Sequence, residues 1–298
     1  MLAGISVLGA WLAMAAPAAA QNPAVTSDPA QDKANPAAMV SFQLPSHGAL
    51  LNALVYVAGG AGPHPTVVLL HGFPGNEKNL DLAQSMRRAG WDVLYFDYRG
   101  SWGSPGNFSF THCLEDTAAA IAWVRDAANA ARVRSDGKTV VLVGHSMGGF
   151  MALEAGARDP SVTAVVTISA SDLGISRLQG VPGDQREAAL RALGEHLAAE
   201  GMAPLAGTTP ESLANEILAN ASAWNFAKLA EGLATRPLLV VTSDDGLRAT
   251  NDALVEAVRG AGNQAASTVH FATDHSYSDR RIALQEAVVE ELGTIGQK

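Results

Sequence analysis

The 298-residue chain has a single cysteine, Cys113. One thiol excludes any disulfide within the chain, so no covalent crosslink contributes to the fold. Cys113 stands at the start of a predicted helix, next to Leu114, where we interpret it as a small buried hydrophobic side chain. A catalytic thiol would need a neighbouring base, so the hydrophobic role is favoured.

Basic residues are also scarce: 20 Lys and Arg stand against 29 Asp and Glu, for a net charge of −9. Proteins that bind nucleic acids gather Lys and Arg against the phosphates, and this sequence shows no such cluster. It also lacks His-Glu-x-x-His or any comparable spacing of metal ligands. We therefore expect small or neutral substrates, no nucleic-acid partner, no metal and no cofactor.

Only one uninterrupted apolar run is long enough to cross a membrane, at residues 2–20. It ends in Ala-Pro-Ala-Ala-Ala before Gln21, which is typical of a secretory signal peptide with an Ala-x-Ala cleavage site. No Lys or Arg precedes the run, so an uncleaved membrane anchor is the alternative. The sequence predicts a signal peptide at residues 1–20, export to the periplasm or out of the cell, and no stable membrane insertion after cleavage. Residues 21–38 are predicted to be a flexible lead-in to one domain at residues 39–298.

Strand and helix patterns alternate along that domain. Two apolar segments, 40–44 and 50–58, flank Pro45-Ser46-His47-Gly48 and predict an antiparallel hairpin. This alternation predicts an α/β fold with a mostly parallel, doubly wound sheet, helices on both faces, and functional residues beyond the carboxyl ends of the strands. Further strands are predicted at 66–70, 92–96, 138–143, 162–169, 237–242 and 267–271, and helices at 79–89, 114–127 and 185–199.

The strand at 138–143 ends in Gly144-His145-Ser146-Met147-Gly148 and enters a helical pattern. A Gly-x-Ser-x-Gly motif at such a turn holds its serine in a strained conformation with the hydroxyl exposed. The glycines remove side chains that would collide there, and the helix that begins at Met147 directs free N–H groups toward the same place. The pattern predicts Ser146 as a nucleophile; the alternative is a small-residue turn that packs a helix on the sheet.

A serine hydroxyl needs a base to take its proton, and the base needs an acidic partner. Three histidines follow Ser146: His196, His270 and His275. His196 falls in a predicted helix and His270 within a strand, whereas His275 lies in a loop just past a strand, within reach of a neighbouring strand end. We therefore predict His275 as the base.

The predicted acid is one of two neighbours, Asp244 and Asp245, which follow the strand at 237–242. The order Ser, Asp, His along the chain fits a serine triad. The register of the turn favours Asp245, just before Gly246, as the partner of His275, and Asp244 then caps the turn. Asp244 stays open as the alternative, and Asp274 is interpreted as a loop residue.

The strand at 66–70 ends in His71-Gly72-Phe73-Pro74-Gly75. Enzymes that transfer acyl groups stabilise an oxyanion, usually with two backbone donors. A loop at this strand end places the N–H of Phe73 beside the N–H of Met147, and these two groups are the predicted oxyanion hole. His71 is expected to bond loop backbone. The alternative is a plain Gly/Pro loop.

Together these motifs make the chain, from residue 39 to residue 293, resemble the α/β-hydrolase superfamily. The segment Asp97-Tyr98-Arg99-Gly100-Ser101-Trp102-Gly103 is similar to one found in the prolyl-oligopeptidase-like and dienelactone-hydrolase-like branches. The resemblance implies a serine hydrolase that acts on esters or peptides. The long propeller domain of prolyl oligopeptidases has no counterpart here. Tyr98 and Arg99 are candidates for lining the pocket, with a surface ion pair as the alternative for Arg99, and neither is assigned a catalytic role.

Residues 171–233 exceed what the minimal fold needs. Apolar residues recur there at helical spacing in two stretches, which predicts amphipathic helices. Helices inserted at this point would cover the strand ends, so we predict a lid that shapes the pocket; the alternative is that they only pack on the core. The two apolar stripes are Ala189, Leu190, Leu193 and Leu197, and Leu213, Ile217, Ala221 and Trp224.

The sequence therefore predicts a serine hydrolase that cleaves carboxylic esters through an acyl-enzyme on Ser146, with His275 and Asp245 as its partners. A small peptidase or amidase of the prolyl-oligopeptidase-like type is the second interpretation. A non-catalytic protein that binds a ligand in the same pocket is the third. The sequence gives no indication of the oligomeric state.

Overall fold

The computed structural model describes residues 21–174 and 181–296. The predicted signal peptide, residues 1–20, and part of the predicted lid, residues 175–180, lie outside this range. Within the predicted lead-in, Pro23–Thr26 forms the short helix α1. The carbonyl oxygen of Ala24 accepts a hydrogen bond from Nε of Arg88 at 2.6 Å, which attaches α1 to helix α2. The flexibility of residues 21–38 stays a prediction.

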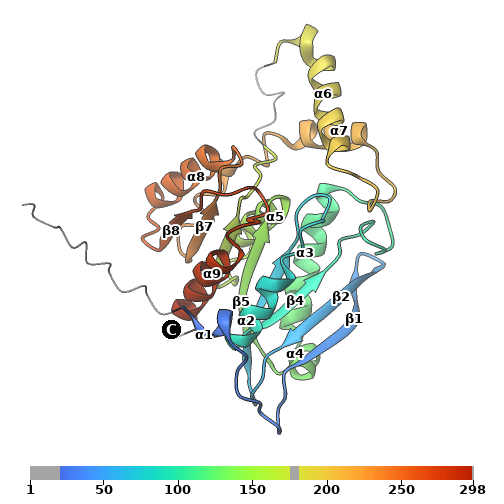
Figure 1. Cartoon of the computed structure of the whole chain (residues 1–298). Helices are drawn as coiled ribbons and strands as arrows, with labels where there is room; N and C mark the ends of the chain where they lie inside the picture. The colour runs from blue at the N-terminus through green and yellow to red at the C-terminus, as the bar shows by residue number, and fades with distance from the viewer. Residues whose placement is uncertain (1–20, 175–180, 297–298) are drawn as a thin grey trace, which may run out of the picture.

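One sheet, of eight strands in the described residues, forms the centre of the molecule, in the order β1-β2-β4-β3-β5-β6-β7-β8 (Figure 1). Strand β2 runs antiparallel to both β1 and β4, and all other neighbours are parallel. The predicted α/β fold, with its mostly parallel sheet and N-terminal hairpin, is confirmed. The strands are β1 (Ala38–Ser46), β2 (Ala49–Val57), β3 (His64–Leu70), β4 (Asp92–Phe96), β5 (Ser135–His145), β6 (Ala164–Ile168), β7 (Leu238–Thr242) and β8 (Ala266–His270).

The turn of the hairpin is shorter than predicted, because β1 continues through Pro45 and Ser46. Only His47 and Gly48 connect the strands, and both have positive φ, 45° and 83°. Two such residues in succession give the tight turn whose twist matches that of the flanking strands.

Helices cover both faces of the sheet, as predicted. Helices α2 and α9 bury Leu82, Met86 and Leu284 on one face, and α3, α5 and α8 bury side chains such as Leu153 and Leu254 on the other. Helix α4 lies where no element was predicted. The helices around the sheet are α2 (Leu80–Arg88), α3 (Phe110–Arg125), α4 (Ala127–Val133), α5 (Met147–Arg158), α8 (Arg248–Gly260) and α9 (Arg281–Ile295).

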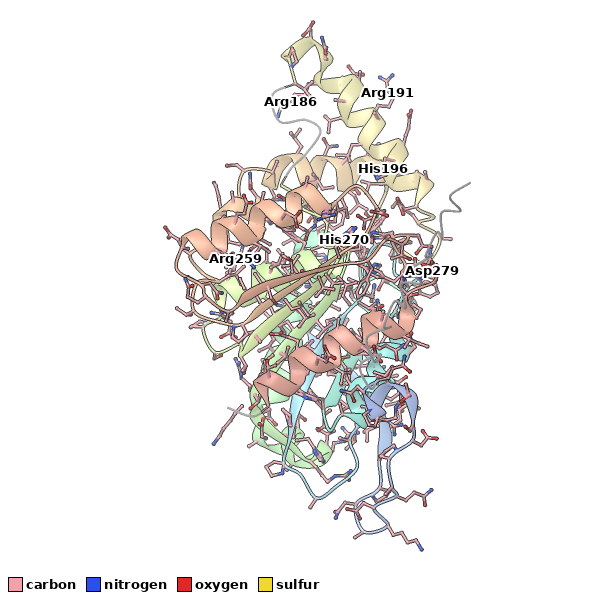
Figure 2. The ribbon with its side chains drawn as sticks, turned by 60° about the vertical axis from the view of Figure 1, so that its left-hand side comes forward. Arg186, Arg191, His196, Arg259, His270 and Asp279 are labelled. Carbon is pink, nitrogen blue, oxygen red and sulfur yellow. The ribbon has the colours of Figure 1, made fainter. Side chains whose placement is uncertain are left out.

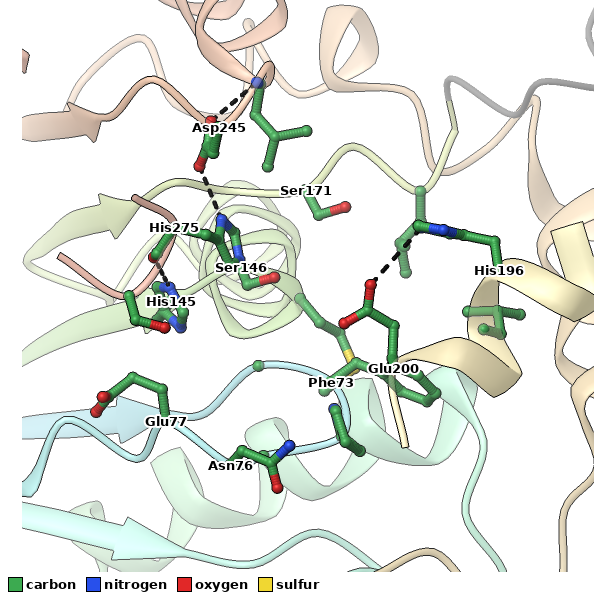
Figure 3. Close-up of a pocket in the computed structure, with 18 of the residues that line it drawn as sticks. Phe73, Asn76, Glu77, His145, Ser146, Ser171, His196, Glu200, Asp245 and His275 are labelled. Atoms are coloured by element: carbon green, nitrogen blue, oxygen red, sulfur yellow. Dashed lines mark hydrogen bonds and ion pairs between the residues drawn. The ribbon is translucent and has the colours of Figure 1, made fainter. Parts of the chain in front are cut away.

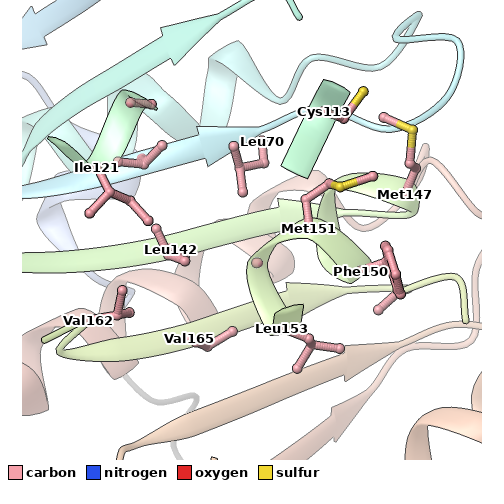
Figure 4. Close-up of a cluster of buried hydrophobic side chains, with 14 of the residues drawn as sticks. Leu70, Cys113, Ile121, Leu142, Met147, Phe150, Met151, Leu153, Val162 and Val165 are labelled. Atoms are coloured by element: carbon pink, nitrogen blue, oxygen red, sulfur yellow. The ribbon is translucent and has the colours of Figure 1, made fainter. Parts of the chain in front are cut away.

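The middle of the sheet is buried on both faces, which is why its strands read as continuous apolar runs. Every residue of β4, β6 and β7 is buried. Figure 4 shows Met151 of α5 and Ile121 of α3 packed with Leu142 of β5. Burying one such aliphatic side chain contributes about 1.5–3 kcal/mol, so this core fixes the strand ends firmly. Cys113 belongs to the same cluster, and burial raises the pKa of its thiol, in agreement with a hydrophobic role.

Helix α3 begins at Phe110 rather than at residue 114. The Ser109 hydroxyl caps it by accepting the His112 N–H at 3.1 Å. The carboxylate of Glu216 also accepts the N–H groups of Phe110 and Thr111, at 3.0 and 2.8 Å. A carboxylate at a helix N-terminus is stabilising, but this one comes from a distant part of the chain, so of these contacts the Ser109 cap alone is local.

The predicted lid region is helical and lies beyond the carboxyl ends of the strands, with α6 extending away from the sheet (Figures 1 and 2). In Figure 2, Arg186 marks the outer end of α6 and His196 the end nearer the sheet. Action as a lid stays a prediction. The elements are η1 (Gly183–Gln185), α6 (Arg186–Ala199), α7 (Pro210–Asn220) and η2 (Phe226–Lys228).

Candidate active site

Ser146 occupies the turn between β5 and α5 in a backbone conformation that residues other than glycine rarely adopt, with φ 55° and ψ −119°. Its N–H donates to the carbonyl oxygen of Ile168 on β6 at 2.9 Å, and its own carbonyl oxygen accepts from Gly149 at 3.0 Å. These bonds hold the strained turn in place. The half-buried serine side chain faces a cavity.

The two glycines of the motif are required by close backbone contacts. A β-carbon at Gly144 would lie 2.0 Å from the carbonyl oxygen of Gly148, and one at Gly148 would lie 2.1 Å from the carbonyl oxygen of Leu70. Both distances are far below a van der Waals contact. The start of α5 therefore packs directly against the end of β3, which carries the predicted oxyanion loop.

His275 lies in the loop between β8 and α9, and its Nδ1 is 2.8 Å from Oδ2 of Asp245, in the loop after β7. The Asp245 side chain is 4% exposed and that of His275 40%. In Figure 3 the His275 ring lies between the Asp245 carboxylate and Ser146. An imidazole that donates from Nδ1 to a carboxylate presents Nε2 as a base. The structure thus gathers the three predicted side chains from three strand ends.

Asp244, the alternative acid, faces a different histidine. Its Oδ1 lies 3.2 Å from Nε2 of His270, and its side chain is 63% exposed. Asp274 accepts the N–H groups of Ser276 and Ser278, at 3.1 and 2.9 Å, and so shapes the loop that carries His275. Both residues are structural in this arrangement.

The carboxylate of Asp245 is held by several donors. Burial alone would raise its pKa, but these hydrogen bonds outweigh burial and keep the pKa well below its usual range. Asp245 is therefore ionised at neutral pH and stabilises a protonated imidazole beside it. The donors are the His275 ring, the Ser169 hydroxyl, the N–H of Leu247 and the Ser243 hydroxyl.

A buried cluster of hydroxyls, which sequence reasoning missed, lies behind Asp245. The Tyr277 hydroxyl is 2.9 Å from Oγ of Ser169, which is 3.1 Å from Oγ of Ser243. Burial raises the pKa of Tyr277 to about 12, so the phenol is a neutral hydrogen-bonding group. Ser169 and Tyr277 both have positive φ, 46° and 57°. The only signal in the sequence was that Ser169 ends one predicted strand and Ser243 directly follows another.

The predicted oxyanion loop follows β3. Phe73 and Met147 both line the cavity, and their joint action as an oxyanion hole stays a prediction. His71 is fully buried, and its Nδ1 lies 2.7 Å from the carbonyl oxygen of Gly72, so it bonds loop backbone as expected. Burial lowers the pKa of His71 to about 4, so the ring is neutral at neutral pH.

The segment from Asp97 to Gly103 supports that loop. Nε1 of Trp102 donates to the carbonyl oxygen of Pro74 at 2.9 Å. The Lys78 ammonium lies 4.4 Å from the centre of the Trp102 ring and 2.9 Å from Oδ1 of Asp97. A cation over an aromatic ring is stabilising. Together these contacts hold the loop that follows β3 in place.

Tyr98 and Arg99 lie outside the residues that line the cavity. Nε of Arg99 is 2.6 Å from Oδ1 of Asp116, and a second bond from the guanidinium reaches Glu115. The ion-pairing interpretation of Arg99 is confirmed, except that the residue is buried rather than on the surface. Tyr98 packs against His71, with 4.7 Å between the ring centres.

The candidate site is a single cavity of about 490 Å³, within the size range of small-molecule sites, roughly 300–1,000 Å³. Part of its wall comes from the insertion: His196, Leu197 and Glu200 lie at the end of α6. Sequence reasoning placed His196 in a predicted helix and missed its place at the cavity. The apolar lining residues are Phe73, Phe110, Met147, Leu173, Leu197 and Leu247, and the polar ones include Asn76, Glu77, Ser171, His196, Glu200 and Ser276.

Among residues 21–174 and 181–296, no group of three or more His, Cys, Asp or Glu side chains is arranged to hold a metal ion. Within the same residues, none of the helices combines the length and the apolar character that crossing a membrane requires.

Solved structures of several esterases resemble the chain. The hyperthermophilic esterase of the archaeon Pyrobaculum calidifontis is 20% identical, with a TM-score of 0.65 over 88% of each chain. EstE1, a thermostable carboxylesterase from a metagenomic library, is 24% identical, with a TM-score of 0.62 over 88% of this chain and 89% of its own. Est1E of Butyrivibrio proteoclasticus, solved with ferulic acid bound, is 19% identical, with a TM-score of 0.63 over 86% of this chain and 99% of its own. These likenesses show a shared fold.

The family model described as alpha/beta hydrolase fold matches residues 65–276. That range holds every predicted site residue, from Phe73 to His275. The comparison with curated proteins gave no match. Because the family model covers more than half of the sequence, the chain belongs to the α/β-hydrolase fold family.

Proposed function

We propose that the protein hydrolyses carboxylic esters by two-step acyl transfer. Oγ of Ser146 attacks the ester carbonyl carbon while Nε2 of His275 takes its proton. The carbonyl electrons move to the oxygen, which the N–H groups of Phe73 and Met147 stabilise. When the tetrahedral intermediate collapses, the ester C–O bond breaks and the leaving alcohol takes the proton from His275.

The second step returns the enzyme to its starting state. Water attacks the acyl-Ser146 carbonyl, His275 takes a proton from that water, and the same proton returns to Oγ of Ser146 as the carboxylic acid leaves. Throughout, ionised Asp245 stabilises the imidazolium and fixes its tautomer. The observation that carries this proposal is the 2.8 Å contact between Asp245 and His275 in the cavity that also holds strained Ser146.

Two further observations favour esters of small alcohols or acids. The cavity has the volume of a small-molecule site, and its wall combines apolar side chains such as Phe73 and Met147 with polar ones such as Ser171. Two of the similar structures named above are of esterases, and the third, Est1E, was solved with ferulic acid bound. Residues 2–20 support the further proposal that the mature protein is exported and begins at Gln21.

A fluorophosphonate probe tests the proposed nucleophile, because only an activated serine reacts with it. We expect wild type to be labelled, Ser146→Ala to be unlabelled, and Ser161→Ala, which removes an exposed serine, to be labelled like wild type. Unlabelled wild type would favour a non-catalytic ligand binder. Turnover of 4-nitrophenyl acetate, compared with aminoacyl arylamides, then separates an esterase from a peptidase.

A further inference from the structure

His145, the residue before the nucleophile, makes a contact that none of the steps above uses. Its ring is buried, and Nε2 lies 2.9 Å from the backbone carbonyl oxygen of His275. The two imidazoles also pack against each other with their planes tilted, with 4.7 Å between their centres and 44° between their planes. Figure 3 shows His145 directly beside His275.

The carbonyl fixes the tautomer of His145. A carbonyl oxygen only accepts hydrogen bonds, so Nε2 of His145 carries the proton and donates it. Nδ1, the other ring nitrogen, is buried and has no hydrogen-bond partner in the part of the chain that the structure describes. Burial, and then the neighbouring His275, lowers the pKa of His145 to about 3. The donor therefore stays neutral when His275 becomes protonated.

Other hydrogen bonds of the His275 loop lead to other segments: the Asp244 N–H donates to the carbonyl oxygen of Thr273 at 3.1 Å, and the Tyr277 hydroxyl lies 2.9 Å from Oγ of Ser169. Asp274 accepts N–H groups within the loop, and Nη1 of Arg281 donates to the carbonyl oxygen of Ser276 at 3.1 Å. The His275 ring itself is bound by Asp245. Among the described residues, the bond from His145 is thus the hydrogen bond that ties the backbone of His275 to the strand end carrying Ser146.

We propose that His145 is a positioning residue, which holds the backbone of the base at a fixed distance from the adjacent nucleophile through its bond to the His275 carbonyl. This inference rests on the proposed function. The base must accept a proton from Ser146 and release it to the leaving group, and both transfers require hydrogen-bond distances. Asp245 limits the rotation of the ring, and His145 limits the movement of the backbone from which the ring projects.

Three variants separate the hydrogen bond from the volume of the ring. His145→Phe keeps a ring but removes the donor. In His145→Gln the amide nitrogen takes the place of Nε2, whereas the Asn amide is one methylene shorter and does not reach the carbonyl. We expect kcat for 4-nitrophenyl acetate to fall about tenfold to a hundredfold in the Phe and Asn variants, to stay within about threefold of wild type in the Gln variant, and KM to change little in all three.

His64→Phe is the matched control. His64 is also buried, and its Nε2 lies 3.2 Å from the carbonyl oxygen of Gly60, but it stands at the opposite end of β3 from the site. We expect this variant to lose stability and keep kcat. Thermal unfolding is measured for every variant, and if His145→Phe does not fold, the comparison of Gln with Asn decides.

The inference is overturned if folded His145→Phe keeps kcat within about twofold of wild type, or if the Gln and Asn variants have the same kcat. Equal losses of kcat in His64→Phe and His145→Phe would also overturn it. These outcomes differ from failure of the proposed function, in which wild type itself neither reacts with the fluorophosphonate nor turns over the ester.

Discussion

Oδ2 of Asp245 lies 2.8 Å from Nδ1 of His275, while the adjacent carboxylate of Asp244 points to His270, 3.2 Å from its Nε2. Two neighbouring acids, identical in charge and length, thus bind two different histidines. Only one of these histidines lies at the cavity with Ser146.

Asp245→Asn should therefore lower kcat strongly, by about a hundredfold to ten-thousandfold, because an amide cannot stabilise an imidazolium and favours the wrong tautomer. Asp244→Asn should leave kcat within about twofold of wild type, since its loss affects only an exposed pair. Steady-state hydrolysis of 4-nitrophenyl acetate measures both. A larger loss in Asp244→Asn than in Asp245→Asn would refute the assignment of the acid.

Gly148→Ala should destabilise the protein by more than about 3 kcal/mol, because the new β-carbon would lie 2.1 Å from the carbonyl oxygen of Leu70 and must displace backbone. Gly293→Ala, in helix α9, is the matched control. A β-carbon there meets nothing within 4 Å, so alanine should raise the free energy of unfolding by about 0.5–1 kcal/mol. Urea unfolding of both variants measures whether the free energy of unfolding falls in Gly148→Ala and rises in Gly293→Ala.

Glu216→Ala should lower the free energy of unfolding by about 1–2 kcal/mol. The substitution removes the acceptor for the N–H groups of Phe110 and Thr111 at the start of α3. The exposed Glu195→Ala, on α6, should change stability by less than about 0.5 kcal/mol. Chemical denaturation compares the two, and an equal effect would argue against an anchoring role for Glu216.

Asp92 gives the protein a defined dependence of stability on pH. Burial raises the pKa of this carboxyl to about 7, against the opposing effect of a hydrogen bond from the Ala58 N–H at 2.8 Å. The unfolded chain releases the same proton near pH 4, about three units lower. The folded chain therefore holds an extra proton in this window, and its free energy of unfolding falls as pH rises from about 4 to about 7.

Asp92→Asn keeps an acceptor for the Ala58 N–H and removes the buried charge. The free energy of unfolding of this variant should therefore change little between about pH 4 and about pH 7, and the variant should be more stable than wild type above pH 7. Urea unfolding at about pH 5 and about pH 8 measures this. The exposed Asp28→Asn serves as control and should follow wild type. The same change in the free energy of unfolding between the two pH values in Asp92→Asn and wild type would contradict the prediction.

The sequence allowed prediction of features whose cause is local. Ser146 was recognisable because strand, glycines and helix follow one another within a few residues. His275 was recognisable because it alone among three histidines directly follows a strand. The alternation of strands and helices along the chain followed from the apolar patterns, and the structure confirms it.

Features that depend on contacts between distant segments were not predictable. The register of the turn favoured Asp245 over Asp244 as the partner of His275 but left Asp244 open, because the choice depends on how β7 and β8 lie against each other. The start of α3 depends on Glu216, from another helix. The bond from His145 to the His275 carbonyl joins the end of β5 to a loop that no pattern pairs with it, because any residue fits the second position of the Gly-x-Ser-x-Gly motif.

The end of α6 supplies His196, Leu197 and Glu200 to the cavity, while Ser146, Asp245 and His275 all follow strands of the sheet. The proposed reaction centre thus follows strands of the sheet, whereas part of the cavity wall comes from the insertion. An insertion of different length or composition would present other chemical groups to the incoming molecule without disturbing the reaction centre. We therefore expect selectivity to be exchangeable by grafting another insertion onto the same sheet.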